Sequence, residues 1–396
     1  IYSLDIDKCD TICLRLKIKA KPEDRYCGLI MRKIKAYLDI KWTHVSIEDI
    51  KKDFSDFDKY VPRLINDYDV HVTRNYVVLK KILRYEEEVA KFMRKLLNLP
   101  SSYLSQEASE LLDKCCRQHK CDSDQQQALR GILENNIVMV QGGAGTGKTT
   151  IIRTLVDFLN HGGIKYVLTS FTGKAVARIR EVVTQSQPLT LHRLIGNRKE
   201  EDKEEEAIQF NYVIIDEASM VETKLFHDFI RRYPFDEYHY KVVFLGDLNQ
   251  LPPIGWGCLF REISKSPRIP TYFLSRCHRV EGSGIYHNAQ LILEGRWFEP
   301  DQNFHLCFDR SPLDIIKEYN LTADNVRVLA PFVETVNQEN LLLQNFFSEG
   351  LPSLVDHKGR RWYQYDRVMM TKNNYTINVM NGQEGFIAYF DDKAKG

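Results

Sequence analysis

A glycine-rich segment at residues 142–149, with the sequence GGAGTGKT, limits the possible folds of this chain more than any other segment. It fits the pattern GxxxxGK[ST], in which glycines let backbone N–H groups turn inward around phosphate oxygens. An apolar run precedes it and a helical pattern follows from Thr150 to Leu159, so the positive N-terminal end of that helix would also face the phosphates. The segment therefore predicts a strand, a phosphate-binding loop and a helix, in this order.

The loop indicates a nucleoside triphosphate site. Lys148 would reach the β- and γ-phosphates, and the Thr149 hydroxyl would ligate Mg²⁺. We therefore predict ATP and Mg²⁺ as cofactors. The residues expected to contact the nucleotide at this loop are Gly142, Gly143, Ala144, Gly145, Thr146, Gly147, Lys148, Thr149 and Thr150.

Two later strand ends supply the side chains that such a loop needs. The apolar run Val213–Ile215 ends in two carboxylates, of which Asp216 would bind Mg²⁺ and Glu217 would orient and deprotonate the attacking water. The run Val243–Leu245 ends in a polar turn, where the neutral amide of Gln250 could sense the γ-phosphate without adding charge. We expect these groups to meet at one nucleotide site.

The chain divides into three regions by composition. Residues 1–120 contain few glycines and no catalytic pattern, and apolar residues at helical spacing predict an amphipathic helix at Val77–Leu97. From residue 121 short apolar runs alternate with helical patterns, which is typical of a parallel sheet covered by helices. A third region begins near Arg276 and contains a buried-strand candidate at Val326–Ala330. The strands expected in the second region are Ile137–Val140, Tyr166–Leu168, Tyr212–Ile215 and Val242–Leu245.

Composition narrows the class of protein further. The net charge of +1 gives no global basic field, so nucleic-acid affinity would depend on local clusters of Lys and Arg. No apolar run is long enough to cross a bilayer, which predicts no membrane partner. The nine cysteines are an odd number and favour reduced thiols. A cluster that could ligate zinc lacks the spacing of a structural zinc site and is better explained as a connector: Cys115, Cys116, His119 and Cys121.

The order of the motifs resembles a known family. GGAGTGKT, DEASM at 216–220 and GDLNQLPP at 246–253 resemble motifs I, II and III of the superfamily-1 helicases, in the RecD-like branch. The resemblance covers about residues 78–390 and implies an ATP-dependent DNA helicase or translocase. Further segments resemble motifs of this branch in the expected order: SDQ at 123–125, TSFTGKA at 169–175, TLHRLIG at 190–196, and the stretches 274–279, 328–331 and 366–382.

The resemblance implies an α/β fold with tandem RecA-like P-loop motor domains, the second incomplete. Residues 1–120 would form a mainly helical N-terminal accessory domain. Residues 121–275 would form the first RecA-like ATPase domain, with a small 1B-like insertion near 188–211. Residues 276–396 would form the second, truncated domain with the start of an inserted SH3-like subdomain.

The resemblance also implies roles for residues outside the phosphate loop. Gln125 would read the adenine base, and Arg279 would be the arginine finger. Movement on single-stranded DNA would run 5′ to 3′, in replication or repair. The residues expected to contact DNA are Thr172, Lys174, His192 and Arg193.

The chain departs from the family in two respects, its later motifs and residues 277–280, and its first residue is a further observation. The later motifs, TxHKSQG and an ALTRA-like segment, do not occur, which predicts ATP binding with poor hydrolysis. The first residue is Ile1 rather than Met, which predicts a fragment or a processed form. Residues 277–280 read CHRV where bacterial members usually have FRQ, which affects the neighbours of Arg279 rather than Arg279 itself.

The acidic run Glu200–Glu206 interrupts the second region. Like charges repel and usually stay solvated, so a surface loop is one interpretation. The other is a docking segment for a basic cleft on a partner, and the resemblance implies replication protein A. A eukaryotic chain would then be nuclear, and otherwise the protein would be cytoplasmic.

Two other functions fit the phosphate loop. A phosphate-loop kinase or GTPase would need a base-recognition motif or a lid, and GDLNQLPP has no place in it. A nucleotide-binding scaffold would recruit a single-strand-binding protein without efficient unwinding. DNA-dependent ATP turnover distinguishes a motor from such a scaffold.

Overall fold

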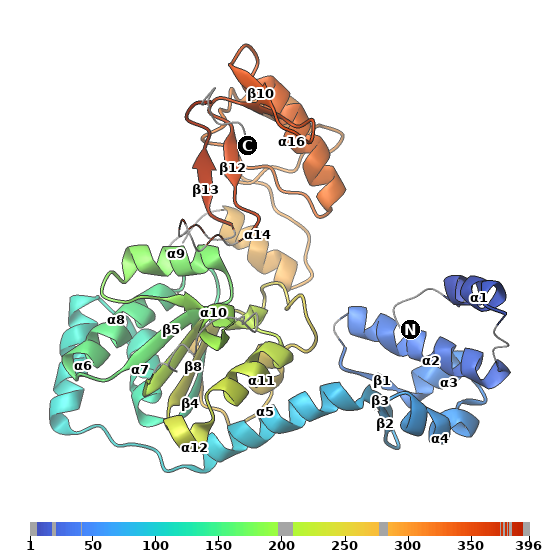
Figure 1. The fold of residues 1–396 in the computed structure, drawn as a ribbon. Coiled ribbons are helices and arrows are strands. Elements are labelled where there is room, and N and C mark those ends of the chain that lie inside the picture. Colours follow the sequence, from blue (N-terminus) through green and yellow to red (C-terminus); the bar gives the residue numbers. More distant parts are fainter. Residues whose placement is uncertain are drawn as a thin grey trace. The chain divides into compact units, whose positions relative to one another are not determined.

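The computed structural model describes residues 6–17, 21–40, 42–196, 209–276, 284–372, 374, 377, 379 and 382–390. The chain folds into two compact units. Unit 1 comprises Ile1–Phe171 and Ala175–Arg279, and unit 2 comprises Thr172–Lys174 and Val280–Gly396. Figure 1 shows the course of the chain through both units.

Unit 1 is built on a six-stranded sheet with the order β6-β5-β7-β8-β4-β9. All neighbouring strands in it are parallel. This sheet confirms the predicted α/β class, and each of the four expected strands lies within an observed one. The strands are β4 (Ile137–Gly142), β5 (Tyr166–Ser170), β6 (Leu189–Thr190), β7 (Tyr212–Asp216), β8 (Lys241–Gly246) and β9 (Thr271–Leu274).

Helices cover both faces of this sheet (Figure 1). In β4, Ile137 and Met139 belong to one buried cluster, whereas Val138 and Val140 belong to the other. Side chains alternate across a strand, so a sheet covered on both faces needs nearly continuous apolar strands. The first face carries α5 (Lys80–Asn98), α10 (Leu191–Ile195), α11 (Thr223–Arg232), α12 (Phe235–Tyr238) and α13 (Leu259–Ser264). The second carries α6 (Gln106–Gln118), α7 (Ser123–Glu134), α8 (Lys148–His161) and α9 (Gly173–Val182).

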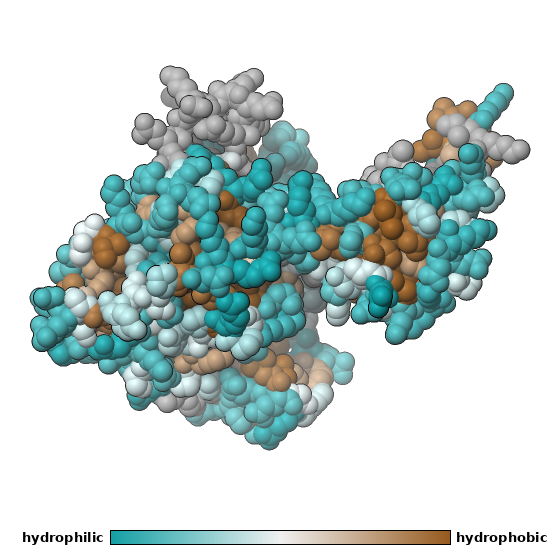
Figure 2. Space-filling view, turned by 90° about the horizontal axis from the view of Figure 1, so that it is seen from below, coloured by the Kyte–Doolittle hydropathy of each residue, from teal (hydrophilic) through white to brown (hydrophobic). Residues whose placement is uncertain are grey.

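The surface of the molecule is largely hydrophilic on the face in Figure 2, with hydrophobic residues gathered at a few places. None of the helices in the described part of the chain combines the length and the apolar character that a bilayer crossing requires.

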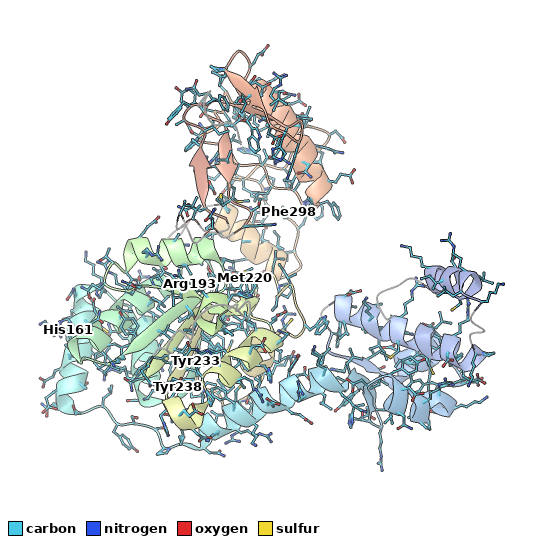
Figure 3. All side chains as sticks on the ribbon, viewed as in Figure 1. His161, Arg193, Met220, Tyr233, Tyr238 and Phe298 are labelled. Atoms are coloured by element: carbon cyan, nitrogen blue, oxygen red, sulfur yellow. The ribbon has the colours of Figure 1, made fainter. Side chains whose placement is uncertain are left out.

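The two ends of the sheet of unit 1 differ, because aromatic rings pack closely at one of them and the parallel strands finish at the other. Figure 3 places Arg193 and Met220 near one end, and Tyr233 and Tyr238 near the other. At the second end the hydroxyl of Tyr240 donates to the carbonyl of Tyr233 over 2.8 Å. The aromatic end is thus packed tightly, and the opposite end, where the parallel strands finish, is left for polar chemistry.

The N-terminal part of unit 1 has its own buried cluster beneath a small antiparallel sheet of order β1-β3-β2. The helix predicted at Val77–Leu97 begins only at Lys80, because β-branched Val77 and Val78 pair with both neighbouring strands of this sheet. The elements are α1 (Ile6–Arg15), α2 (Pro22–Asp39), β1 (His44–Ser46), α3 (Ile47–Asp53), α4 (Phe57–Asp67), β2 (Val70–Val72) and β3 (Tyr76–Leu79).

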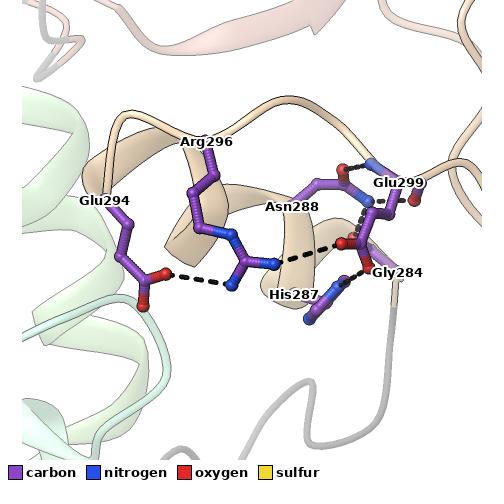
Figure 4. A network of polar contacts seen from close by, with 6 residues as sticks. All are labelled: Gly284, His287, Asn288, Glu294, Arg296 and Glu299. Atoms are coloured by element: carbon purple, nitrogen blue, oxygen red, sulfur yellow. Dashed lines mark hydrogen bonds and ion pairs between the residues drawn. The ribbon is translucent and has the colours of Figure 1, made fainter.

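Unit 2 contains three helices and two β-hairpins among its described residues. Asn288 is fully buried and joins α14 to the chain that follows it, because its amide donates to the carbonyls of Gly284 and Glu299 over 2.8 Å each (Figure 4). The elements are α14 (Gly284–Leu293), α15 (Pro312–Glu318), α16 (Val333–Phe347), β10 (Ser353–Val355), β11 (Arg361–Tyr363), β12 (Arg367–Met369) and β13 (Glu384–Phe386).

The buried strand predicted at Val326–Ala330 is wrong for this structure. The segment has no strand assignment, and the side chain of Leu329 is 93% exposed. Its apolar residues have the composition of a strand, but a strand also needs neighbours that accept its backbone hydrogen bonds. Among the described residues no strand pairs with it.

The cysteine cluster lies in the core of unit 1. Cys115, Cys116 and Cys121 are buried there, and the ring of His119 pairs with Asp157. Among the residues that the structure describes, no group of three or more His, Cys, Asp or Glu side chains is placed to hold a metal ion. These thiols contribute to packing in this structure.

A matched pair of glycine substitutions tests the close packing of α7 on β9. A Cβ atom at Gly131 would lie 2.1 Å from the ring of Tyr272, whereas one at Gly28 in α2 would meet nothing within 4 Å. We expect Gly131→Ala to lower the free energy of unfolding by about 1–3 kcal/mol, because the ring must move. Gly28→Ala should raise it by about 0.5–1 kcal/mol, because alanine favours a helix interior. Urea unfolding of both variants checks this, and a Gly131→Ala protein as stable as wild type would contradict it.

Candidate nucleotide site

The phosphate loop joins β4 to α8, as the sequence predicts. Gly145 and Gly147 have φ angles of 81° and 88°, which residues with a Cβ atom rarely adopt. The ammonium of Lys148 donates to the carbonyls of Gly142 and Gly143, over 2.5 and 3.1 Å. The hydroxyl of Thr146 also donates to the carbonyl of Gly143, over 3.0 Å. Lys148 therefore lies against the mouth of the loop, next to the N-terminus of α8.

Two carboxylates stand at the end of β7. Asp216 is the last residue of that strand, and its side chain is 9% exposed. Glu217 follows with a φ of 51°, in the left-handed region that is uncommon for a residue with a side chain. Strained backbone of this kind concentrates at functional sites, where the surrounding structure holds it in place.

Burial and neighbouring charge set the ionisation of Asp216. Burial raises the pKa of Asp216 from 3.8 to about 6, and the carboxylate of Glu217 adds to this rise. A backbone hydrogen bond with Glu217, Lys148 and Arg178 act in the opposite direction. Asp216 is thus a carboxylate whose charge the protein leaves only partly compensated.

Several buried polar atoms around these carboxylates lack a hydrogen-bond partner. Among the described residues the four that lie at the ends of β5 and β7 are Ser170 Oγ, Asp216 Oδ1, Glu217 Oε2 and Ser219 Oγ. A buried oxygen without a partner costs about 1–3 kcal/mol, so such a group usually serves a bound ion, water or substrate. Mg²⁺ prefers oxygen ligands, so the unpartnered carboxylate oxygen of Asp216 fits a magnesium site, to which the Thr149 hydroxyl of the loop would be the second protein ligand.

The end of β8 brings a third segment to the loop. The side-chain oxygen of Gln141, at the end of β4, accepts from the N–H of Leu248 over 3.2 Å. The N–H of Gln250 donates to the carbonyl of Asp247 over 3.2 Å, and its side chain is half-buried. These bonds hold the turn that carries Gln250 beside the strand that carries the loop.

Asp247 is a site residue that the sequence reasoning missed. It is 6% exposed, and its Oδ2 lies 3.9 Å from the position of a Cβ atom on Gly143. Its Oδ1 accepts from the N–H of Asn249 over 2.9 Å. An acid directly after an apolar strand is the same signal that identified Asp216, and it applies here too. The carboxyl ends of β4, β5, β7 and β8 therefore all contribute to one site.

Gln125 lies at the start of α7 and contacts the phosphate loop, and its role in reading the base stays a prediction. Its side chain is 2% exposed, donates to the carbonyl of Thr146 over 3.3 Å and accepts from the N–H of Asp122 over 3.1 Å. Asp122 in turn caps α7 by accepting from the N–H of Gln125 over 2.8 Å. Gln125 therefore joins the start of α7 to the phosphate loop.

The residues predicted to contact DNA do not all lie in one unit. Thr172 and Lys174 belong to unit 2, where the ammonium of Lys174 pairs with Glu384 at 2.8 Å. His192 and Arg193 are exposed in unit 1 at the start of α10, and the ring of His192 stands edge-on to Phe171 at 5.5 Å. Their contacts with DNA stay a prediction. Arg279 and the acidic run lie outside the described residues.

Comparison with known proteins finds similarity to an AAA domain family and to DNA helicases. A family described as an AAA domain matches residues 125–256. The ATP-dependent RecD2 DNA helicase of Deinococcus radiodurans is 26% identical over 331 residues, which cover 78% of this chain and 44% of that protein. The RecBCD enzyme subunit RecD of Buchnera aphidicola subsp. Acyrthosiphon pisum is 28% identical over 210 residues, covering 47% of this chain and 34% of that protein.

A eukaryotic relative and a solved structure are also similar. DNA helicase B of Mus musculus is 23% identical over 228 residues, which cover 47% of this chain and 21% of that protein. The sequence alone also suggests a likeness to DNA helicase B, from the poorly matching N-terminal region and the acidic insertion. The similarity to the mouse protein agrees with that interpretation. The crystal structure of Pif1 helicase from Candida albicans has a TM-score of 0.46 and 19% identity, covering 69% of this chain and 70% of that chain.

These relatives confirm the resemblance to the RecD-like branch of the superfamily-1 helicases. The chain spans less than half the length of the curated relatives named above.

The raised pKa of Asp216 predicts how the free energy of unfolding depends on pH. The folded protein holds the Asp216 proton up to about pH 6, whereas an unfolded carboxyl releases it near 3.8. The ionised form therefore costs folding free energy above pH 6, and this cost disappears as the pH falls below 4. We expect Asp216→Asn to raise the free energy of unfolding by about 1–3 kcal/mol at pH 7.5, and by clearly less at pH 4.5.

Urea unfolding at both pH values measures this difference. Asp39→Asn, at an exposed position at the end of α2, is the control and should change stability little at either pH. A loss of stability in Asp216→Asn at pH 7.5 would show that this carboxylate is compensated in the folded state.

Proposed function

We propose that this chain, a relative of the superfamily-1 RecD-like helicases, is the ATP-driven motor of a DNA helicase. The observation that carries the proposal is the electrostatic contact of Lys148 with the buried Asp216, beside the half-buried Glu217. Both carboxylates keep one oxygen without a hydrogen-bond partner. A nucleotide–metal complex supplies the charge and the ligands that these groups lack. The ATP-dependent helicase relatives support the same activity.

Each group has a distinct task in ATP hydrolysis. Lys148 neutralises charge on the β- and γ-phosphates, and the N–H groups of the loop bind their oxygens. Thr149 and Asp216 hold Mg²⁺, which, when bound, screens the charge that develops on the phosphates. Glu217 orients the attacking water and accepts its proton. Gln250, held beside β4 through the bond between Leu248 and Gln141, reports the γ-phosphate to the turn that follows.

We propose single-stranded DNA as the track, with movement from 5′ to 3′ and a role in replication or repair, in the nucleus if the chain is eukaryotic. The exposed His192 and Arg193 support binding to phosphate and sugar, together with Thr172 and Lys174. Contacts of this kind make binding salt-dependent and tolerant of sequence. The family resemblance supports Arg279 as the arginine finger.

Steady-state ATP hydrolysis, with and without single-stranded DNA, tests this proposal. We expect Lys148→Ala to lower the turnover at least about 100-fold, because several kcal/mol of transition-state stabilisation are lost. Lys114→Ala, at an exposed position on α6, is the matched control and should hydrolyse ATP like wild type. Wild-type turnover in Lys148→Ala would exclude this site. Nucleotide binding without DNA-stimulated turnover, also in a chain extended past Gly396, would favour a scaffold.

We further propose that the acidic run Glu200–Glu206 binds a basic cleft on replication protein A. Its six acidic residues around one lysine support a charge-dependent contact. Replacing those acids with lysines should weaken binding to replication protein A at least about tenfold and leave ATP hydrolysis unchanged. Titration calorimetry measures the first effect. Equal binding by both forms would identify the run as a solvated loop.

A further inference from the structure

Two cysteine side chains meet where α6 ends. The chain leaves the helix through Lys120, whose φ of 53° is left-handed. The N–H of Cys121 donates to the carbonyl of Cys116 over 2.9 Å, and the N–H of Lys120 donates to the carbonyl of Arg117 over 3.3 Å. These two bonds form a Schellman motif, in which the side chains at the two ends of the turn frequently contact each other. Here both ends carry a thiol, that of Cys116 and that of Cys121.

This helix cap brings the two cysteines to the separation that a disulfide needs. The backbone bond of 2.9 Å between Cys121 and Cys116 keeps their Cα atoms within about 7 Å of each other. Disulfides join residues whose Cα atoms lie about 4.4–6.8 Å apart. The two thiols also share a side-chain hydrogen bond. Rotation of the side chains therefore suffices to bring the sulfurs to bonding distance, and the fold of the cap stays as it is.

Hydrogen bonds favour the thiolate form of Cys121. The bond from the Cys116 thiol lowers the pKa of Cys121 to about 7, against the effect of burial. The hydroxyl of Thr154 in α8 lies 3.2 Å from the Cys121 sulfur and lowers this pKa further. The same thiol–thiol bond and burial raise the pKa of Cys116, so Cys116 keeps its proton. The pair therefore consists of a nucleophilic thiolate and a thiol that donates to it.

Other buried thiols of unit 1 have a different environment. Cys115 precedes Cys116 in α6, and Cys27 lies in the buried cluster of the N-terminal part. Burial raises the pKa of both, which makes thiols unreactive. Cys121 is also the most exposed of the three cysteines at this helix end, at 8% against 2% for Cys115 and 3% for Cys116. An oxidant should therefore react first with the sulfur of Cys121.

We propose that Cys116 and Cys121 are an oxidation site, at which hydrogen peroxide forms a disulfide across the cap of α6. The Cys121 thiolate attacks one peroxide oxygen, the O–O bond breaks, and the departing hydroxide takes a proton from solvent to become water. Cys121 is then a sulfenic acid. The Cys116 sulfur attacks the Cys121 sulfur, the S–O bond breaks, and the hydroxide leaves with the Cys116 proton as a second water. The two thiols lose two electrons, and the peroxide gains them.

The reaction uses only the residues of this cap, so the proposal does not depend on the proposed function. Cys121 acts as the residue that is oxidised, and Cys116 as the resolving residue that converts the sulfenic acid into a disulfide. A dithiol such as dithiothreitol reverses the reaction by thiol–disulfide exchange.

Mass spectrometry of the whole folded chain, treated with hydrogen peroxide, tests this proposal. The remaining free thiols are blocked with iodoacetamide before digestion. Trypsin cuts after Lys114, Arg117 and Lys120, so the disulfide would join the peptide 115–117 to the peptide 121–130. We expect this linked pair to be the most abundant disulfide, and dithiothreitol added before the blocking step to remove it. Wild-type protein in which both peptides carry only blocked thiols after peroxide treatment would overturn the proposal.

Three variants distinguish an oxidation site from thiols that only pack. Cys116→Ala should abolish the linked peptides and leave a sulfenic acid at Cys121, which dimedone labels. Cys121→Ala should abolish both signals. The matched control is Cys115→Ala, a buried neighbour in the same tryptic peptide, which should keep the linked peptides as in wild type.

Linked peptides that persist in Cys116→Ala and disappear in Cys115→Ala would assign the bond to the wrong thiol and contradict the proposal. If a variant fails to fold, fragmentation of the linked peptides from wild type still identifies which of the two adjacent sulfurs is bonded to Cys121.

Discussion

Unit 1 keeps a buried and only partly compensated carboxylate beside a phosphate-binding loop, at a cost in stability that the rest of its sheet must offset. Asp216 is 9% exposed, and burial raises its pKa to about 6. A fold selected only for stability would replace such a group or pair it fully. The sheet tolerates it because β4, β5, β7 and β8 are buried and apolar over most of their length. The buried apolar residues of these strands thus provide the stability, and the polar residues at their carboxyl ends form the candidate site.

Side-chain hydrogen bonds connect the segments that lie at the carboxyl ends of these strands. Gln141 holds the turn after β8 next to β4, and Gln125 holds the start of α7 against the loop. Asp124 accepts from both the N–H and the hydroxyl of Ser275, which follows β9. These bonds connect segments that lie far apart in the sequence, and they hold the turn after β8, the start of α7 and the end of β9 in place around the loop.

Much of this could be predicted from the sequence, because periodicity and strand-end chemistry are local signals. The four apolar runs and the phosphate loop can be recognised from their own residues alone. The two acids at the end of β7 can also be read directly from the sequence. The strand at Val326–Ala330 failed because pairing depends on neighbours that composition does not reveal. The bond between Gln125 and Thr146 could not be predicted, because it joins residues 21 positions apart whose contact no local pattern reveals. Asp247 carried the same signal as Asp216 and was overlooked beside Gln250.

The magnesium dependence of nucleotide binding tests the central claim most directly. Titration calorimetry would compare a non-hydrolysable ATP analogue binding to wild type and to Asp216→Asn, with and without Mg²⁺, at pH 7.5. If Asp216 and the loop hold a nucleotide–metal complex together, Mg²⁺ tightens binding to wild type at least about tenfold and leaves the variant unchanged. Equal tightening in both proteins, or none in wild type, would contradict this account of the buried carboxylate.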